Sequence, residues 1–239
     1  LDYIENQYCN DMNDLVIFLN SHIIKDKKHE LKDILHLITK IANEHHRTPD
    51  FFMRLEQIIQ IFAESIKNNF TNNEIFNIFQ SNKRLLLFLI QEKLLTIDKS
   101  IALIIASKKF KKKGYANYFF PEIKSFIDIK LRQEIECENN QIFKFQELEN
   151  KYDEIFEKRR KIGENDSYLC EMIRNDSIED FIISYSRTNF SLSRTIDDSI
   201  FETNCFLLKN NPTLIEYSAF YGSIQIFRYL YMNGVNLSP

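Results

Sequence analysis

Residues 210–235 read NNPTLIEYSAFYGSIQIFRYLYMNGV, and this stretch decides the fold. It predicts a helix that opens at Thr213, a turn at Gly222, a second helix, and a stop at Gly234. Thr213 and Glu216 have the spacing of a capping box, in which a hydroxyl and a carboxylate satisfy free N–H groups at a helix start. The stretch therefore predicts one helix-turn-helix unit. The apolar positions expected to face a shared core are Ile215, Ala219, Ile226, Phe227 and Leu230.

Glycine and proline are rare in the chain, with four of each among 239 residues. A strand-rich fold or a phosphate-binding loop needs more turn-forming residues. Apolar residues elsewhere recur at helical spacing, as in residues 31–42 and 51–66. The apolar run at residues 85–90 is far shorter than the ~20 residues that cross a bilayer. The sequence therefore predicts an all-α protein, an elongated α-solenoid of helix-turn-helix units with no membrane span.

A second copy of the unit lies 46 residues earlier in the chain. When Asp176 is placed on Gly222, Ser177 falls on Ser223, and the flanking apolar positions coincide. Ser177 and the acid three residues later imitate a capping box. The glycine spacing of the terminal unit is typical of ankyrin repeats, whose period is about 33 residues. The longer separation here predicts an enlarged loop at residues 187–211.

A fainter third copy fits around Asn82, with a capping box at Thr71 and Glu74 that is two residues out of register. The repeats therefore weaken toward the N-terminus, and we predict three segments. These are a helical cap or leading region at residues 1–70, degenerate helical repeats at 71–164, and ankyrin-type repeats at 165–239. We also expect the last segment to be truncated at its C-terminus.

Motifs spread over most of the chain resemble those of one known family. They are IANEHHRTP at residues 41–49, IFNIF at 75–79, YFFPEI at 118–123, KIGENDSY at 161–168, SIFETN at 199–204, and the terminal unit. Together they are similar to the expanded ankyrin-repeat family of a parasitic protozoan, whose members carry a domain of unknown function ahead of and overlapping their repeats. The resemblance implies an α-solenoid and partner binding, and it supplies no functional residues.

An ankyrin unit usually starts with Thr-Pro-Leu-His. The corresponding four residues of this chain, which begin at Thr213, read TLIE instead. By analogy with ankyrin proteins, we predict a non-catalytic protein–protein interaction module, a scaffold or adaptor. Tyrosine is a favoured interface anchor, although packing of either tyrosine in the core is an equal alternative. The partner and the oligomeric state stay open. The partner-contact candidates are Asn210, Asn211, Thr213, Tyr217 and Tyr221.

Two basic runs, Lys108–Lys113 and Lys158–Lys161, support an alternative function as a nucleic-acid- or chromatin-associated adaptor. The net charge of −3 gives the chain no global attraction to nucleic acid. Lysines that follow a helix also favour the negative end of its dipole. We therefore interpret both runs as solvated helix ends and faces, and leave open whether they are targeting signals.

The sequence carries no nucleophile elbow, phosphate-binding loop or dinucleotide fingerprint. Its four cysteines, at positions 9, 137, 170 and 205, lack metal spacing and are typical of free thiols inside cells. We therefore expect no catalytic residues, no cofactor and no metal, and a protein of the cytoplasm, with the nucleus as the alternative. An enzyme whose site is assembled from distant residues is the second alternative function.

Overall fold

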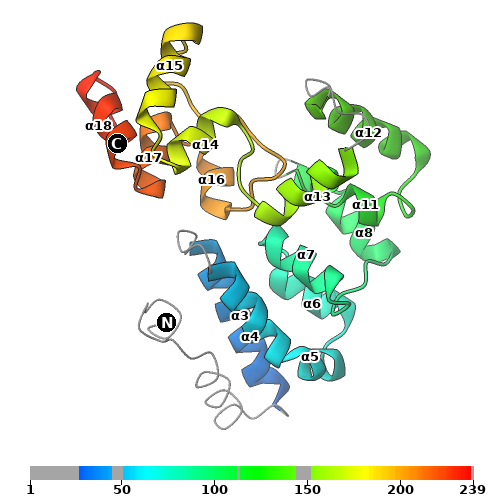
Figure 1. Cartoon of the computed structure of the whole chain (residues 1–239). Helices are drawn as coiled ribbons and strands as arrows, with labels where there is room; N and C mark the ends of the chain where they lie inside the picture. The colour runs from blue at the N-terminus through cyan, green and yellow to red at the C-terminus, as the bar shows by residue number, and fades with distance from the viewer. Residues whose placement is uncertain (1–26, 45–50, 112–113, 144–151, 238–239) are drawn as a thin grey trace. The chain divides into compact units, whose positions relative to one another are not determined.

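The computed structural model describes residues 27–44, 51–111, 114–143 and 152–237. Helices dominate these ranges, whose one β-type pairing is an isolated bridge between Thr195 and Thr213 (Figure 1). The prediction of an all-α protein is therefore confirmed. Thr48 and Pro49, which belong to a motif quoted above, lie outside the described residues.

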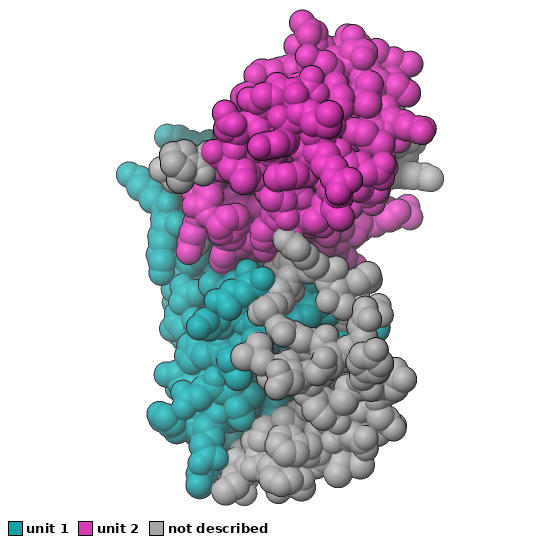
Figure 2. All heavy atoms as spheres, turned by 90° about the vertical axis from the view of Figure 1, so that its left-hand side faces the viewer, with its two compact units in different colours: residues 1–147 teal, residues 148–239 magenta. Residues whose placement is uncertain are grey.

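The chain divides into two compact units, residues 1–147 and 148–239 (Figure 2). The divisions that the sequence suggested fall elsewhere, after residues 70 and 164. In the first unit, α3 (Lys28–Glu44) packs against α6 (Asn72–Phe79), which lies beyond the first of those divisions. The described part of the first seventy residues therefore shares one apolar core with the helices that follow.

Short helices follow one another closely in the rest of the first unit. They are α4 (Phe51–Ile61), α5 (Ala63–Asn69), α7 (Lys83–Gln91), α8 (Lys99–Ile105), α9 (Lys108–Lys111), α10 (Tyr115–Tyr118), α11 (Phe120–Ile123) and α12 (Ile129–Phe143). Their apolar sides meet in a single cluster around residues such as Leu35, Leu55, Phe79 and Leu89. Burial of this apolar surface is the main source of the unit's stability.

The start of α6 is fixed by the capping box that the sequence predicted. Glu74 N–H donates to Thr71 Oγ1 at 3.3 Å, and Thr71 N–H donates to Glu74 Oε2 at 2.8 Å. Lys28 Nζ, at the start of α3, lies 2.7 Å from Glu74 Oε1. At the far end of α3, Asn43 Nδ2 donates to Ser81 Oγ, just beyond the end of α6, at 3.0 Å. The two helices therefore run parallel.

The second unit holds two helix pairs that pack against each other. The first pair is α14 (Tyr168–Arg174) and α15 (Ile178–Thr188), and the second is α17 (Leu214–Tyr221) and α18 (Ile224–Met232). α14 contacts α17 and α15 contacts α18, so the pairs stack helix on helix (Figure 1). The unit also contains α13 (Tyr152–Ile162), together with α16 (Cys205–Asn210) inside the segment predicted as an enlarged loop.

Equivalent turns join the helices of both pairs, as the alignment of Asp176 with Gly222 predicted. Both residues have left-handed backbones, with φ of 50° and 71°. The following residue, Ser177 or Ser223, donates its N–H to a carbonyl five residues earlier, at 3.0 Å and 2.9 Å. The internal repeat is thus present in the backbone geometry as well as in the sequence.

Ser177 does not form the capping box that its spacing to Asp180 suggested. Its side chain makes no capping hydrogen bond to α15, and Ser223 makes none to α18. The tight turn gives the two serines ψ values of 76° and 80°, far from the extended ψ of 166° at the capping residue Thr213. The first helix of each pair, in contrast, is capped by its own hydroxyl residue, Ser167 or Thr213.

The core of the second pair follows the prediction in part. Ile215, Ile226 and Leu230 are fully buried. Phe227 is partly buried against the same cluster, but Ala219 is exposed, so its inward assignment is wrong. The reason is that α14 and α15 cover only one face of α17 and α18 in the described structure.

The α6/α7 pair of the first unit resembles α17/α18 in a register that differs from the predicted one. Both first helices have eight residues and begin with capping boxes, at Thr71 and Thr213. Asn82 is the N-cap residue of α7, and the N-cap residue of α18 is Ser223. Asn82 therefore corresponds to Ser223 in the structure, whereas the sequence alignment had matched Asn82 with Gly222. The connection is one residue longer in the first unit, and therefore no single register fits both helices.

Candidate interaction surface

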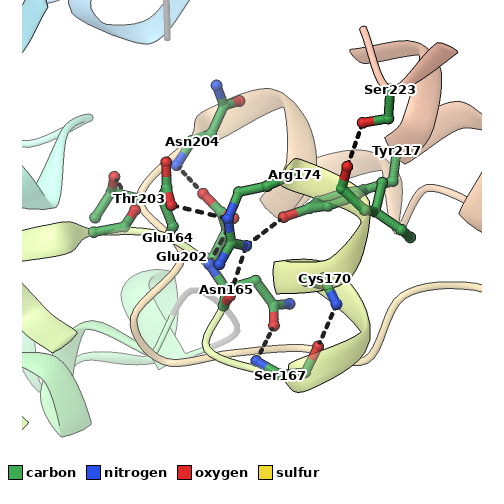
Figure 3. A network of polar contacts seen from close by, with 12 residues as sticks. Glu164, Asn165, Ser167, Cys170, Arg174, Glu202, Thr203, Asn204, Tyr217 and Ser223 are labelled. Atoms are coloured by element: carbon green, nitrogen blue, oxygen red, sulfur yellow. Dashed lines mark hydrogen bonds and ion pairs between the residues drawn. The ribbon is translucent and has the colours of Figure 1, made fainter. Parts of the chain in front are cut away.

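Tyr217 lies inside the second unit. Its side chain is 1% exposed, and its hydroxyl accepts a hydrogen bond from Arg174 Nη1 at 3.0 Å (Figure 3). Burial raises the pKa of Tyr217 far above its usual range. The assignment of Tyr217 as a partner contact is therefore corrected: the residue lies one helical turn after Thr213, on the side of α17 that α14 covers.

Arg174, at the end of α14, is the centre of a polar network (Figure 3). Its Nε lies 2.9 Å from Glu164 Oε2, and its Nη1 also donates to the carbonyl of Asn165 at 2.8 Å. The arginine side chain is only 14% exposed. A buried cation is stable only when acceptors replace its water, and here Glu164, Asn165 and Tyr217 do so. The guanidinium therefore ties together the segment before α14, α14 itself and α17.

Glu202 joins two of the sequence motifs that carry the family resemblance. It is 4% exposed, and its carboxylate accepts the N–H of Asn165 at 3.2 Å and the N–H of Asn204 at 2.7 Å. Beside it, Thr203 Oγ1 donates to the carbonyl of Gly163 at 2.7 Å. Residues 161–168 and 199–204 are therefore held against each other, a contact that neither motif predicted by itself.

Tyr221 is half-buried and contributes to both the interior and the surface. Its ring centroid lies 4.7 Å from that of Tyr217 and 5.1 Å from that of Phe220. The hydroxyl oxygen is buried, and burial raises the pKa of Tyr221 above its usual range. The phenol is therefore neutral at physiological pH, and only part of the ring can meet a partner.

The other three candidates have structural roles of their own. Thr213 forms the capping box, with its N–H 2.7 Å from Glu216 Oε2. Asn211 is exposed and ends α16 with a left-handed φ of 42°. It also lines a small hollow beside the polar network, together with Asp197 and Asp198. Asn210 is exposed, so both asparagines can touch a partner without disturbing the core.

A stacked aromatic pair next to these residues was not predicted. The rings of Phe206 on α16 and Phe220 on α17 are nearly parallel, 6° apart in plane, with centroids 5.8 Å apart. Phe206 is 51% exposed, and Asn210 Nδ2 donates to its carbonyl at 3.1 Å. We define Phe206, Asn210, Phe220 and Tyr221 as the aromatic face. In the sequence, the one local indication of this face was Phe206, an aromatic residue within the segment predicted as an enlarged loop.

The arginines of the second basic run, Lys158–Lys161, pair with acids of their own unit. Arg159 Nη1 lies 2.7 Å from Asp166 Oδ2, and Arg160 Nη2 lies 2.7 Å from the glutamate three residues before it. The last two lysines of the first run, Lys108–Lys113, lie outside the described residues. Charges that are neutralised internally add little to phosphate binding, so these two arginines give the nucleic-acid alternative no support of their own.

Comparisons and searches for other sites add no identification. No family model, no curated protein and no solved structure matches this chain. Within the described residues, no group of three His, Cys, Asp or Glu side chains could hold a metal ion. No helix in the same ranges is both long and apolar enough to cross a membrane.

Proposed function

We propose that this chain is a non-catalytic protein–protein interaction module of ankyrin type, a scaffold or adaptor whose aromatic face receives the partner. The observation that carries the proposal is the stack of two equivalent helix pairs in the second unit. Stacked repeats form rigid frames that present side chains from their first helices and loops. The sequence resemblance to a protozoan ankyrin-repeat family supports the same assignment.

The aromatic face has the composition that protein interfaces favour. Phenylalanine and tyrosine are enriched in the buried centres of such interfaces, and an asparagine beside them supplies hydrogen bonds. Phe206 is held in place by stacking on Phe220, so little side-chain entropy is lost when a partner covers it. The frame beneath the face is rigid because Arg174 and Tyr217 link α14 to α17.

The buried polar groups of the second unit support a structural role rather than a chemical one. Arg174 and Glu202 each bond to backbone groups of neighbouring segments. Burial raises the pKa of the Cys170 thiol to about 11, so it is protonated at physiological pH. A protonated, fully buried thiol is a poor nucleophile.

The proposal is tested by affinity capture from an extract of the source cells with the whole chain as bait. The variant is Phe206→Ser, and the matched control is Ile183→Ser, because Ile183 is 48% exposed on α15, outside the aromatic face. Both variants must keep the parent thermal midpoint and helical circular dichroism. We expect a protein that parent and control retain and Phe206→Ser loses. Equal capture by all three would reject the aromatic face.

A further inference from the structure

The small hollow in the second unit lies next to the aromatic face. Phe206 and Asn210 of the aromatic face are four residues apart, so they share one side of α16. Leu207 and Asn211, which line the hollow, each follow one residue later and therefore lie toward a neighbouring side. The hollow has a volume of about 20 Å³, enough for one group of the size of a water molecule. A partner that covers the aromatic face can therefore reach the hollow as well.

The buried part of the lining is polar and belongs to the network around Arg174 (Figure 3). It consists of Asn165, Glu202 and Tyr217, which are 3%, 4% and 1% exposed. The carboxylate of Glu202 is held in place by the two backbone N–H groups that it accepts. The inner end of the hollow is therefore a fixed arrangement of oxygen and amide groups with one negative charge.

The exposed part of the lining carries two more carboxylates and an amide, from Asp197, Asp198 and Asn211. Asp197 is paired with Arg194, whose Nη2 lies 2.6 Å from its carboxylate. The side chains of Asp198 and Asn211 form no hydrogen bond or ion pair within the described residues. None of the residues that line the hollow is a lysine, an arginine or a histidine. The lining therefore offers acceptors and negative charge to a group that enters.

The shape and the walls of the hollow select among cationic groups. Leu207, Leu208 and Pro212 contribute apolar walls. A group that enters must therefore combine an apolar stem with a hydrogen-bond donor at its end. Lysine has this form, because its methylenes pack on apolar surface and its ammonium is a compact charge with three donors. The planar guanidinium of arginine is larger than the one water-sized group for which the hollow has room.

The nearby arginines leave this negative charge in place. Arg174 donates to the hydroxyl of Tyr217, but its charge is paired with Glu164 at 2.9 Å. Arg194 is likewise paired with Asp197. A metal ion does not fit as the occupant, because no group of three His, Cys, Asp or Glu side chains in the described residues could hold one. The chemistry of the hollow therefore matches an organic cation.

We propose that the hollow receives the ammonium group of a lysine side chain from the protein that covers the aromatic face. The methylenes of this lysine pack against Leu207 and Pro212, and its ammonium donates to Asp198 and Asn211. The charge of Glu202 attracts the ammonium from the inner end. The inference rests on the proposed function and adds the chemistry of the partner, which presents a lysine beside the apolar residues that meet the aromatic face.

Titration of the whole chain with Nα-acetyl-lysine methylamide tests the site directly. The signals to follow by NMR are the side-chain amides of Asn165 and Asn211, which line the hollow. Nα-acetyl-norleucine methylamide has the same stem without the ammonium and is the matched control ligand. At constant ionic strength, we expect saturable shifts of both amides with the lysine compound and none with the norleucine compound. The corresponding arginine compound should bind more weakly than lysine.

Variants of the rim identify the groups that hold the ammonium. Asp198→Asn and Asn211→Gly should each raise the dissociation constant about twofold to fivefold, read at Asn165. Glycine tolerates the left-handed φ of 42° at position 211. The control is Asp180→Asn, which removes the same charge from an exposed position on α15 and should leave the dissociation constant unchanged. All variants must keep the parent thermal midpoint.

The proposal is overturned if the lysine compound causes no shifts, or if the norleucine compound causes equal ones. Equal shifts with potassium chloride, or equal affinity for the arginine compound, would also overturn it, because the hollow would not select an ammonium. The capture experiment separates this inference from the proposed function. A partner that Phe206→Ser loses, together with no lysine binding, would reject the hollow and keep the aromatic face. Lysine binding without a captured partner would reject the proposed function and keep the hollow.

Discussion

In the first unit, α3 meets α6/α7 through neutral side-chain amides, of which Asn82 is fully buried, whereas in the second unit α14 meets α17 through a guanidinium that is only 14% exposed. Asn82 Nδ2 donates to Asn43 Oδ1 at 3.0 Å, and Asn43 in turn donates to Ser81. Arg174 instead reaches Tyr217 at 3.0 Å while it is paired with Glu164. One joint therefore uses neutral groups, and the other uses a charge.

The difference follows from the apolar surface that each unit can bury. The first unit has a large, continuous apolar cluster, so its amides need only fix the register of the helices. The second has a smaller cluster around Ile173, Phe181 and Ile226. There a buried charge with several acceptors ties segments together, and the loss of any partner leaves the rest unsatisfied. The comparison predicts that substitutions at the two joints differ in severity.

The largest expected effect is that of Arg174→Ala. The change leaves Tyr217 without its donor and Glu164 without its cation, and we expect a loss of about 3–5 kcal/mol in the free energy of unfolding of the second unit. Hydrogen exchange should accelerate in α14 and α17 more than in α3 and α6. The control is Arg228→Ala, since Arg228 is exposed on α18. A loss below about 1 kcal/mol would contradict the central role of the guanidinium.

A second expected effect is a loss of stability at alkaline pH. A thiol in the unfolded chain ionises near pH 8.5, whereas burial raises the pKa of Cys170 to about 11 in the folded protein. Its contribution is therefore fully present below about pH 8.5 and is lost as the pH rises toward 11, by on the order of 3 kcal/mol. Tyr217 acts in the same direction at higher pH, because burial also raises its pKa.

Chemical denaturation between pH 7 and pH 10.5 measures this loss. Cys170→Ala should flatten the pH dependence across that interval, whereas Cys137→Ala should leave it unchanged because Cys137 is exposed. Equal slopes for the two variants would show that the Cys170 thiol does not cause the effect.

The smallest expected effect belongs to the amide joint. Asn82→Ala removes both the cap of α7 and the bond to Asn43, and we expect a loss of about 2 kcal/mol. Asn43→Ala removes the joint but keeps the cap, so about 1 kcal/mol is expected. Urea unfolding of the two variants measures both losses. If Asn43→Ala cost as much as Arg174→Ala, the contrast between the two joints would be lost.

The parts of the fold that depend on neighbouring residues could be predicted from the sequence. The capping boxes at Thr71 and Thr213 and the left-handed turns at Asp176 and Gly222 are set by spacing over three to five residues. The contact between Phe206 and Phe220 depends on how a long connection folds back, which no short spacing encodes.

The position of Tyr217 could not be predicted for a different reason. Helix α17 is apolar on most sides, with Leu214, Ile215, Tyr217 and Ser218 all buried. Periodicity identifies a buried face only when another face is polar. The side that packs against α14 was therefore ambiguous, and the distant partner Arg174 decided it.

The left-handed turn at Asp176 also has a consequence for the order of folding. The Asp176 carboxylate caps α18, because it accepts the N–H groups of Gln225 and Ile226, each at 3.0 Å. Asp176 precedes α18 by about fifty residues and is placed only when the turn between α14 and α15 has formed. A nine-residue helix is marginal by itself in water. During synthesis the first pair emerges from the ribosome before the second, and it then serves as the template on which α18 becomes stable.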